Sequence, residues 1–177
     1  DGKVSKEFIE GISKNELIGT DIADKVTFKE DGSGLFGTVN FDAKDLTHID
    51  TGAGNDTVTI NGEVNTGIHT GAGADTITVN GGSDLYIDGG EGNDKISVDW
   101  AKTKGNVTLV ADEGTTYADT ITVKNLKVAN TNIAVDNGKL IVTEDGTGRQ
   151  LIIDNWEASG IKGVTFADGT KTRDYLN

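Results

Sequence analysis

Three short segments of the chain repeat the order Gly-x-Gly-x-Asp-x-Val/Ile-x at one fixed spacing. Their aspartates, Asp56, Asp75 and Asp94, lie 19 residues apart. The paired glycines are Gly52 and Gly54, Gly71 and Gly73, and Gly90 and Gly92. Each aspartate offers carboxylate oxygens, and glycine accepts the positive φ values with which a turn directs carbonyl oxygens to one side. These segments therefore favour the binding of a cation through oxygen ligands.

Calcium suits such a ligand set, because Ca²⁺ takes six to eight oxygens at about 2.3–2.6 Å. A single turn of this kind offers only about half of that shell, so a second turn must be stacked on the first. Three turns in register predict two complete sites. One lies between the turns of Asp56 and Asp75, and the other lies between the turns of Asp75 and Asp94.

The charge of the chain agrees with a cation partner. Lysine and arginine number 16 against 29 aspartates and glutamates, which gives a net charge of −13. Such a surface repels nucleic acid and anionic membranes, so we expect neither as a partner. The sequence also has no apolar run of the length that a membrane-spanning helix needs, so we expect no membrane insertion. Bound Ca²⁺ would offset the self-repulsion of the carboxylates.

Apolar residues recur at the same spacing as the aspartates and predict the elements that position them. The recurring columns are Ile49, Ile68 and Ile87; Val58, Ile77 and Ile96; and Ile60, Val79 and Val98. Alternate residues point inward from a strand, so each 19-residue coil holds two short strands and two turns. One coil cannot bury its own apolar face, but coils stacked at about 4.8 Å can. The prediction is an all-β fold, a right-handed parallel β-solenoid or β-roll.

Outside the repeat the pattern changes, and we predict three regions. Residues 1–45 form an irregular N-terminal cap with helical character at 6–10 and one degenerate coil. Residues 46–124 form the calcium-binding solenoid. Residues 125–177 form a C-terminal cap with a β-hairpin, in which Trp156 and Phe166 plug the open end of the core. Asp24 and Asp119 belong to echoes of the repeat that lack the glycine pair, so we expect weaker calcium binding there, if any.

The Gly-x-Gly-x-Asp repeat over residues 50–98 resembles the calcium-binding repeats of RTX (repeats-in-toxin, haemolysin-type) proteins. Typical RTX rolls carry a calcium turn on both sides of an 18-residue coil. The one-sided, 19-residue pattern here is similar to the solenoid domains of giant RTX adhesins. One such domain binds ice through rows of Thr and Asn, but Ala53, Ala72 and Glu91 occupy the matching Thr position here, so we do not extend ice binding to this chain.

The resemblance implies a bacterial protein exported by type I secretion, either secreted or held at the cell surface, that folds on Ca²⁺ outside the cell. We therefore expect a structural module of an adhesin or surface-layer protein. The first residue is Asp1 and not Met, and we expect a part of a larger chain. Two alternatives stay open: an accessory domain of a type I-secreted enzyme, and a domain that binds a cell-surface glycan or a protein.

Sequence features bear on these alternatives only weakly. No nucleophile motif such as Gly-x-Ser-x-Gly is present, so we expect no enzymatic activity in this chain. His48 and His69 are the only histidines, stand outside any zinc-like cluster and are expected at solvent-facing strand positions. A sugar-binding platform would need exposed aromatic residues, for which Tyr86, Trp100 and Tyr117 are the candidates.

Overall fold

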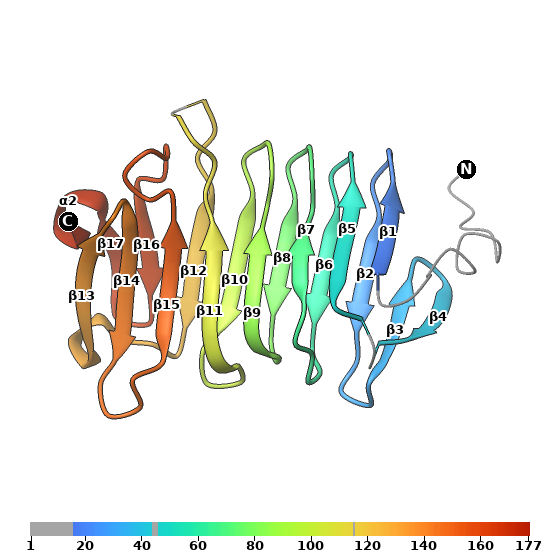
Figure 1. The fold of residues 1–177 in the computed structure, drawn as a ribbon, viewed down its shortest axis with the longest axis horizontal. Helices are drawn as coiled ribbons and strands as arrows, with labels where there is room; N and C mark the ends of the chain where they lie inside the picture. Colours follow the sequence, from blue (N-terminus) through green and yellow to red (C-terminus); the bar gives the residue numbers. More distant parts are fainter. Residues whose placement is uncertain (1–15, 44–45, 115) are drawn as a thin grey trace.

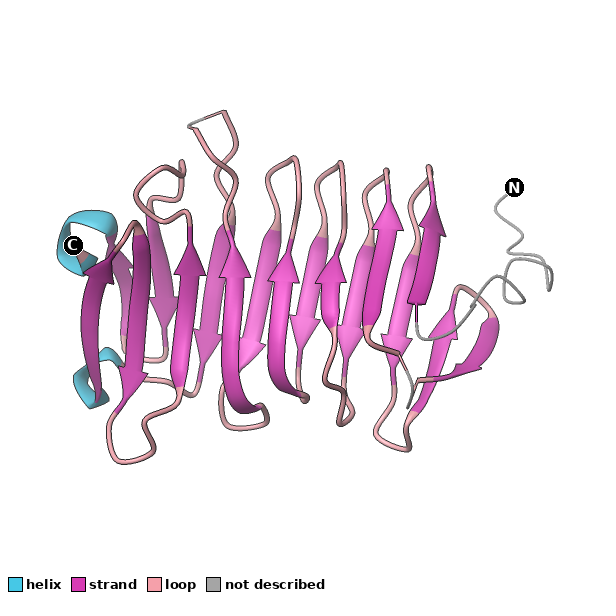
Figure 2. Cartoon of the chain, viewed as in Figure 1, coloured by secondary structure: helices cyan, strands magenta, loops and turns pink. Residues whose placement is uncertain are grey.

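The computed structural model describes residues 16–43, 46–114 and 116–177, which form strands β1 to β17, a 3-10 helix and a short α-helix. The two helical segments are η1 (Val128–Asn130) and α2 (Arg173–Leu176), and both lie toward the C-terminal end of the molecule (Figure 2). The expected all-β class is therefore confirmed. The helical character expected at residues 6–10 falls outside the described residues.

The strands form two sheets that face each other (Figure 1). Sheet 1 has the order β1 (Glu16–Thr20), β5 (His48–Gly52), β7 (Gly67–His69), β9 (Ser83–Asp88), β11 (Lys104–Val110), β15 (Gln150–Asp154), β14 (Lys139–Glu144) and β13 (Thr131–Asp136). Sheet 2 has the order β17 (Gly169–Thr172), β16 (Gly163–Phe166), β12 (Thr120–Lys124), β10 (Lys95–Asp99), β8 (Thr76–Val79), β6 (Thr57–Ile60), β2 (Lys25–Phe28), β3 (Ser33–Phe36) and β4 (Val39–Asp42).

Both sheets are mixed. Neighbours from β1 to β15 in sheet 1 and from β2 to β16 in sheet 2 pair in parallel. Antiparallel pairs lie beyond three of the four ends of these parallel runs, with β14 and β13 beyond β15, β17 beyond β16, and β3 and β4 beyond β2. At the fourth end, β1 is the last described strand of sheet 1. From β5 to β12 the chain alternates between the two sheets, and the turns that lead from sheet 1 to sheet 2 line the upper edge in Figure 1.

The N-terminal region contains the coil expected within residues 1–45, but the cap beside it is regular and not irregular where it is described. Strands β1 and β2 form a coil that pairs in parallel with β5 and β6, and β3 and β4 form an antiparallel extension of sheet 2. At the other end the expected hairpin is present, since β14 pairs with β15 from Leu140 against Ile153 to Thr143 against Gln150.

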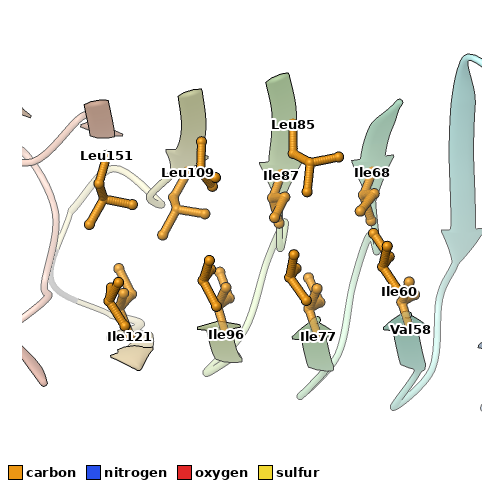
Figure 3. Packing of buried hydrophobic residues seen from close by; sticks show 14 of the residues in the cluster. Val58, Ile60, Ile68, Ile77, Leu85, Ile87, Ile96, Leu109, Ile121 and Leu151 are labelled. Atoms are coloured by element: carbon orange, nitrogen blue, oxygen red, sulfur yellow. The ribbon is translucent and has the colours of Figure 1, made fainter. Parts of the chain in front are cut away.

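The core contains the three expected apolar columns, one from sheet 1 and two from sheet 2. In sheet 1, Ile49 is in register with Ile68 and Ile68 with Ile87. The two columns of sheet 2 are also in register, and each of these nine side chains is at most 2% exposed. Figure 3 shows the isoleucines and leucines of the two sheets pointing toward one another. A slip of one residue would bury the intervening threonines instead, so the pattern specifies the register.

Two arginines each cover the ring of a buried tryptophan in the C-terminal half of the core. The guanidinium of Arg173 lies 4.3 Å from the ring centre of the buried Trp156 and donates to the carbonyl oxygens of Ile161 at 2.8 Å and Trp156 at 2.7 Å. The guanidinium of Arg149 lies 4.1 Å from the ring centre of Trp100 and donates to the Trp100 carbonyl at 3.2 Å. Trp156 and Phe166 are buried, as expected of residues that plug the core.

Replacement of Arg173 tests how much its contact with Trp156 and the nearby carbonyl oxygens stabilises the fold. We expect Arg173→Met to lower the free energy of unfolding by about 2–3 kcal/mol, because carbonyl oxygens around Trp156 lose a charged donor. The matched control is Lys171→Met, since Lys171 lies 5.2 Å from the ring centre of the exposed Tyr175, and an exposed contact of this kind is worth at most about 1 kcal/mol. Urea denaturation in saturating calcium measures the free energy of unfolding of both variants. Equal losses would contradict a stabilising role of the Arg173 contact.

Candidate metal centre in the stacked glycine turns

The three glycine–aspartate turns lie in one stack. We name them by their aspartates: the Asp56 turn (residues 52–56), the Asp75 turn (71–75) and the Asp94 turn (90–94). They connect β5 to β6, β7 to β8 and β9 to β10 at the upper edge of Figure 1. The structure thus brings together all nine residues that the sequence singled out.

The aspartates form an internal ladder in which each carboxylate reaches back to the preceding coil. The backbone N–H of Asp56 donates to Oδ1 of Asp75 at 2.7 Å, and that of Asp75 donates to Oδ1 of Asp94 at 2.9 Å. The ladder extends at both ends, with Asp24 N–H to Asp56 Oδ1 at 2.7 Å and Asp94 N–H to Asp119 Oδ1 at 3.1 Å. The three central aspartates are only 1% exposed. Each carboxylate is therefore fixed between two turns.

The second carboxylate oxygen of each central aspartate is unpaired. Oδ2 of Asp56, Asp75 and Asp94 is buried without a hydrogen-bond partner in the described part of the chain. The Thr51 hydroxyl donates to the Thr70 carbonyl at 3.0 Å and the Thr70 hydroxyl to the Gly89 carbonyl at 2.9 Å. The same two hydroxyls lower the pKa of Asp56 and Asp75, but by less than burial raises it. A buried carboxylate oxygen without a partner is costly. Three at equivalent positions fit a cation between the turns, and their oxygen chemistry suits Ca²⁺.

The glycines are required by the close approach of successive turns. Gly71 has φ +91° and Gly73 has φ +156°, the region that side chains disfavour. A Cβ added at Gly71 would overlap the carbonyl oxygen of Gly52, and one at Gly73 would overlap that of Gly54. The Asp94 turn meets the Asp75 turn in the same way. Carbonyl oxygens of one turn therefore face the Cα atoms of the next, and only glycine leaves room for this arrangement.

Burial also changes the proton affinity of the ladder. It raises the pKa of Asp56 and Asp75 above the usual range. For Asp94, burial and then the negative charges of Asp119 and Asp75 raise the pKa to about 7, and burial raises the pKa of Asp119 to about 6. The charged form is thus disfavoured unless a positive charge is present. A divalent cation would reverse this effect, because its charge stabilises the carboxylates.

The two ends of the ladder differ from its centre. Oδ2 of Asp24 accepts hydrogen bonds from the Thr20 N–H at 2.7 Å and the Thr20 hydroxyl at 3.0 Å, so this carboxylate is satisfied within its own turn. Beyond the Asp94 turn, the Asp112 carboxylate accepts from the Gly92 N–H at 3.3 Å. The equivalent N–H groups of Gly54 and Gly73 donate instead to backbone carbonyls of the next turn. The Asp112 side chain therefore ends the stack beyond the Asp94 turn, where no further glycine turn follows.

Two of these features were missed by the sequence analysis. Asp24 was expected in an echo of the repeat without the glycine pair, and its stacking on the Asp56 turn was not predicted. The turn that precedes the Asp56 turn in space holds Asp24, 32 residues upstream, because β3 and β4 lie between the two coils in sequence. Asp112 carries no motif, and only its place two residues after Val110, which pairs with Asp88, marks it as part of the stack.

Other candidate ligands do not form a second centre. His69 Nδ1 lies 3.4 Å from Asp88 Oδ2 at a half-exposed strand position. No three or more His, Asp and Glu side chains of the described ranges are grouped closely enough to hold a metal by themselves, so an ion in the turns would need backbone oxygens. Trp100 is buried while Tyr86 is 49% exposed, so these two do not form an aromatic platform. No described helix is long and apolar enough to cross a membrane.

Comparisons with family models, with curated proteins and with solved structures each found no match.

The raised pKa values predict that protons substitute in part for a cation. In a chelating buffer, stability from Asp94 and Asp119 is complete below the usual pKa of 3.8 and is lost as the pH rises through about 6 and 7. We expect the folded population, measured by circular dichroism in EGTA, to increase when the pH is lowered from about 7.5 to about 5.5. Asp94→Asn, which is neutral throughout, should weaken this dependence. A folded population that falls on acidification would contradict the prediction.

Proposed function

We propose that this chain is a calcium-binding structural module of the RTX kind, which folds on Ca²⁺ outside a bacterial cell as part of an adhesin or surface-layer protein. The observation that carries the proposal is the row of buried, unpaired Oδ2 atoms of Asp56, Asp75 and Asp94 inside stacked glycine turns. The module is proposed to have no enzymatic role, and the ion that its turns are proposed to bind is calcium.

The fold that we propose is a right-handed parallel β-solenoid with antiparallel strands at both ends. Support comes from the alternation of the chain between the two sheets and from parallel ladders that repeat every 19 residues, with Ile60 against Val79 and Val79 against Val98. Right-handed connections are the general rule for parallel strands. Antiparallel strands cover the parallel strands β15, β16 and β2, whereas β1 is the last described strand of sheet 1. Covering the ends in this way is what a stack of coils needs.

The two predicted sites lie between neighbouring turns. The Asp75 carboxylate lies between the Asp56 and Asp75 turns, since its Oδ1 accepts from the Asp56 N–H. The Asp94 carboxylate lies between the Asp75 and Asp94 turns in the same way. Residues of the Asp75 turn thus belong to both sites. Each ion would complete its shell with backbone carbonyls, because one carboxylate supplies two oxygens and Ca²⁺ takes six to eight.

Coupling between calcium and folding follows from charge. The chain has a net charge of −13 and buries a column of carboxylates one strand spacing apart. Without a cation these groups repel one another and lose their hydration, so the unfolded chain gains relative stability. Binding to the folded form alone shifts the equilibrium toward it. Such a module would stay loose in a cell interior poor in calcium and fold in a calcium-rich exterior.

Calcium calorimetry on two variants tests the proposed sites. Asp75→Ala should weaken overall calcium affinity by at least about tenfold, or about 1.4 kcal/mol, because the Asp75 turn serves two ions. Asp119→Ala is the matched control, since Asp119 accepts the same kind of backbone bond but lies beyond the last glycine turn. Its loss should change affinity by less than about threefold. Equal effects would mean that the proposed register is wrong, and a wild-type chain that takes up no calcium would refute the function.

A further inference from the structure

The coil before the Asp56 turn repeats part of the contacts found between the glycine turns. We call residues 20–24 the Asp24 turn. Thr20 is in register with Gly52 and Lys25 with Thr57. The Asp24 N–H donates to Asp56 Oδ1 at 2.7 Å, the same bond at the same length that the Asp56 N–H makes to Asp75 Oδ1. The Ala53 N–H donates to the Thr20 carbonyl as the Ala72 N–H donates to the Gly52 carbonyl, but the Ile22 N–H donates to the Thr20 hydroxyl at 3.4 Å and not to the next turn. The Asp24 turn thus stacks on the Asp56 turn with part of the contacts that join the glycine turns.

Backbone oxygens of the Asp24 turn also lie close to the glycines of the Asp56 turn, although the Ile22 oxygen lies farther away than its counterparts between the glycine turns. A Cβ at Gly52 would overlap the Thr20 carbonyl oxygen, and one at Gly54 would lie 3.0 Å from the Ile22 carbonyl oxygen. At the next junction the corresponding oxygens belong to Gly52 and Gly54. Carbonyl ligands do not depend on side-chain identity, so a turn without glycines can still present them. The glycines that the close approach requires are those of the Asp56 turn, and they are present.

An unpaired ligand atom lies at the same junction. Asp56 is 1% exposed, its Oδ1 is bound to the Asp24 N–H across the junction, and its Oδ2 is buried without a partner. The Asp24 carboxylate is engaged by Thr20 of its own turn. Asp56 therefore reaches the Asp24 turn in the same way as Asp75 reaches the Asp56 turn, with Oδ1 bound to the backbone and Oδ2 unpaired. The sequence predicts two calcium sites, but three aspartates have a buried Oδ2 without a partner. If each such atom is a calcium ligand, one more site is needed.

We propose a third calcium site between the Asp24 and Asp56 turns, held by the Asp56 carboxylate and the carbonyl oxygens of Thr20 and Ile22. This site rests on the proposed function and extends it to a turn without the glycine motif. Its ion would tie the N-terminal coil to the repeat across the 32-residue separation of Asp24 and Asp56. No equivalent site is assigned beyond the Asp94 turn, where the Asp112 carboxylate takes the place of a turn carbonyl.

The number of calcium ions bound per chain tests the proposal. The measurement is equilibrium dialysis of the full chain at saturating calcium in about 0.15 M KCl, which screens weak surface binding. We expect three ions for the wild type, two for Asp56→Asn and three for the control Asp119→Asn. The wild-type count decides the matter even if a variant does not fold.

The outcomes separate the two proposals. Two ions in the wild type would overturn the third site and leave the proposed function intact. Three ions in both the wild type and Asp56→Asn would overturn the assignment of the third ion to this junction. No bound calcium in the wild type would overturn the third site and the proposed function together.

Discussion

The structure depends on how closely one glycine turn can lie on the next. At this separation a carbonyl oxygen of Gly52 faces the Cα of Gly71, and a carboxylate of one turn bonds the backbone of its neighbour. The close approach leaves no room for a side chain and excludes water from one oxygen of each aspartate. The turns thus bury carboxylates whose charged form is disfavoured unless a positive charge is present. The proposed cation between the turns would stabilise that form, and the rest of the fold keeps the turns in register.

The two sheets supply that register. Parallel ladders join each coil to the next, and the isoleucine columns behind the turns allow no slip without burying threonine. The core is thin and its stability comes from stacking, so its ends need separate closure. At the C-terminal end, antiparallel strands and the Arg173–Trp156 contact provide it. At the N-terminal end, β3 and β4 extend sheet 2.

Much of this arrangement was predictable because the repeat is strict. The period of the aspartates predicted which glycines, aspartates and isoleucines would share a column, and the hairpin over 139–154 followed from its alternating pattern. The N-terminal coil was not predictable in its place, because the β3–β4 insertion breaks the period and puts Asp24 32 residues from Asp56. Asp112 was not predictable for another reason. No glycine turn follows the Asp94 turn to supply a carbonyl acceptor for the Gly92 N–H, and the Asp112 carboxylate accepts that hydrogen bond instead.

The central claim is that the fold requires a cation between the buried carboxylates. Far-ultraviolet circular dichroism at neutral pH, recorded in EGTA and again after calcium is restored, tests it most directly. The account predicts a weak β signal in EGTA and a strong one with calcium, together with a higher midpoint of thermal unfolding. A chain that keeps its full β signal in EGTA and gains no thermal stability from calcium would contradict it.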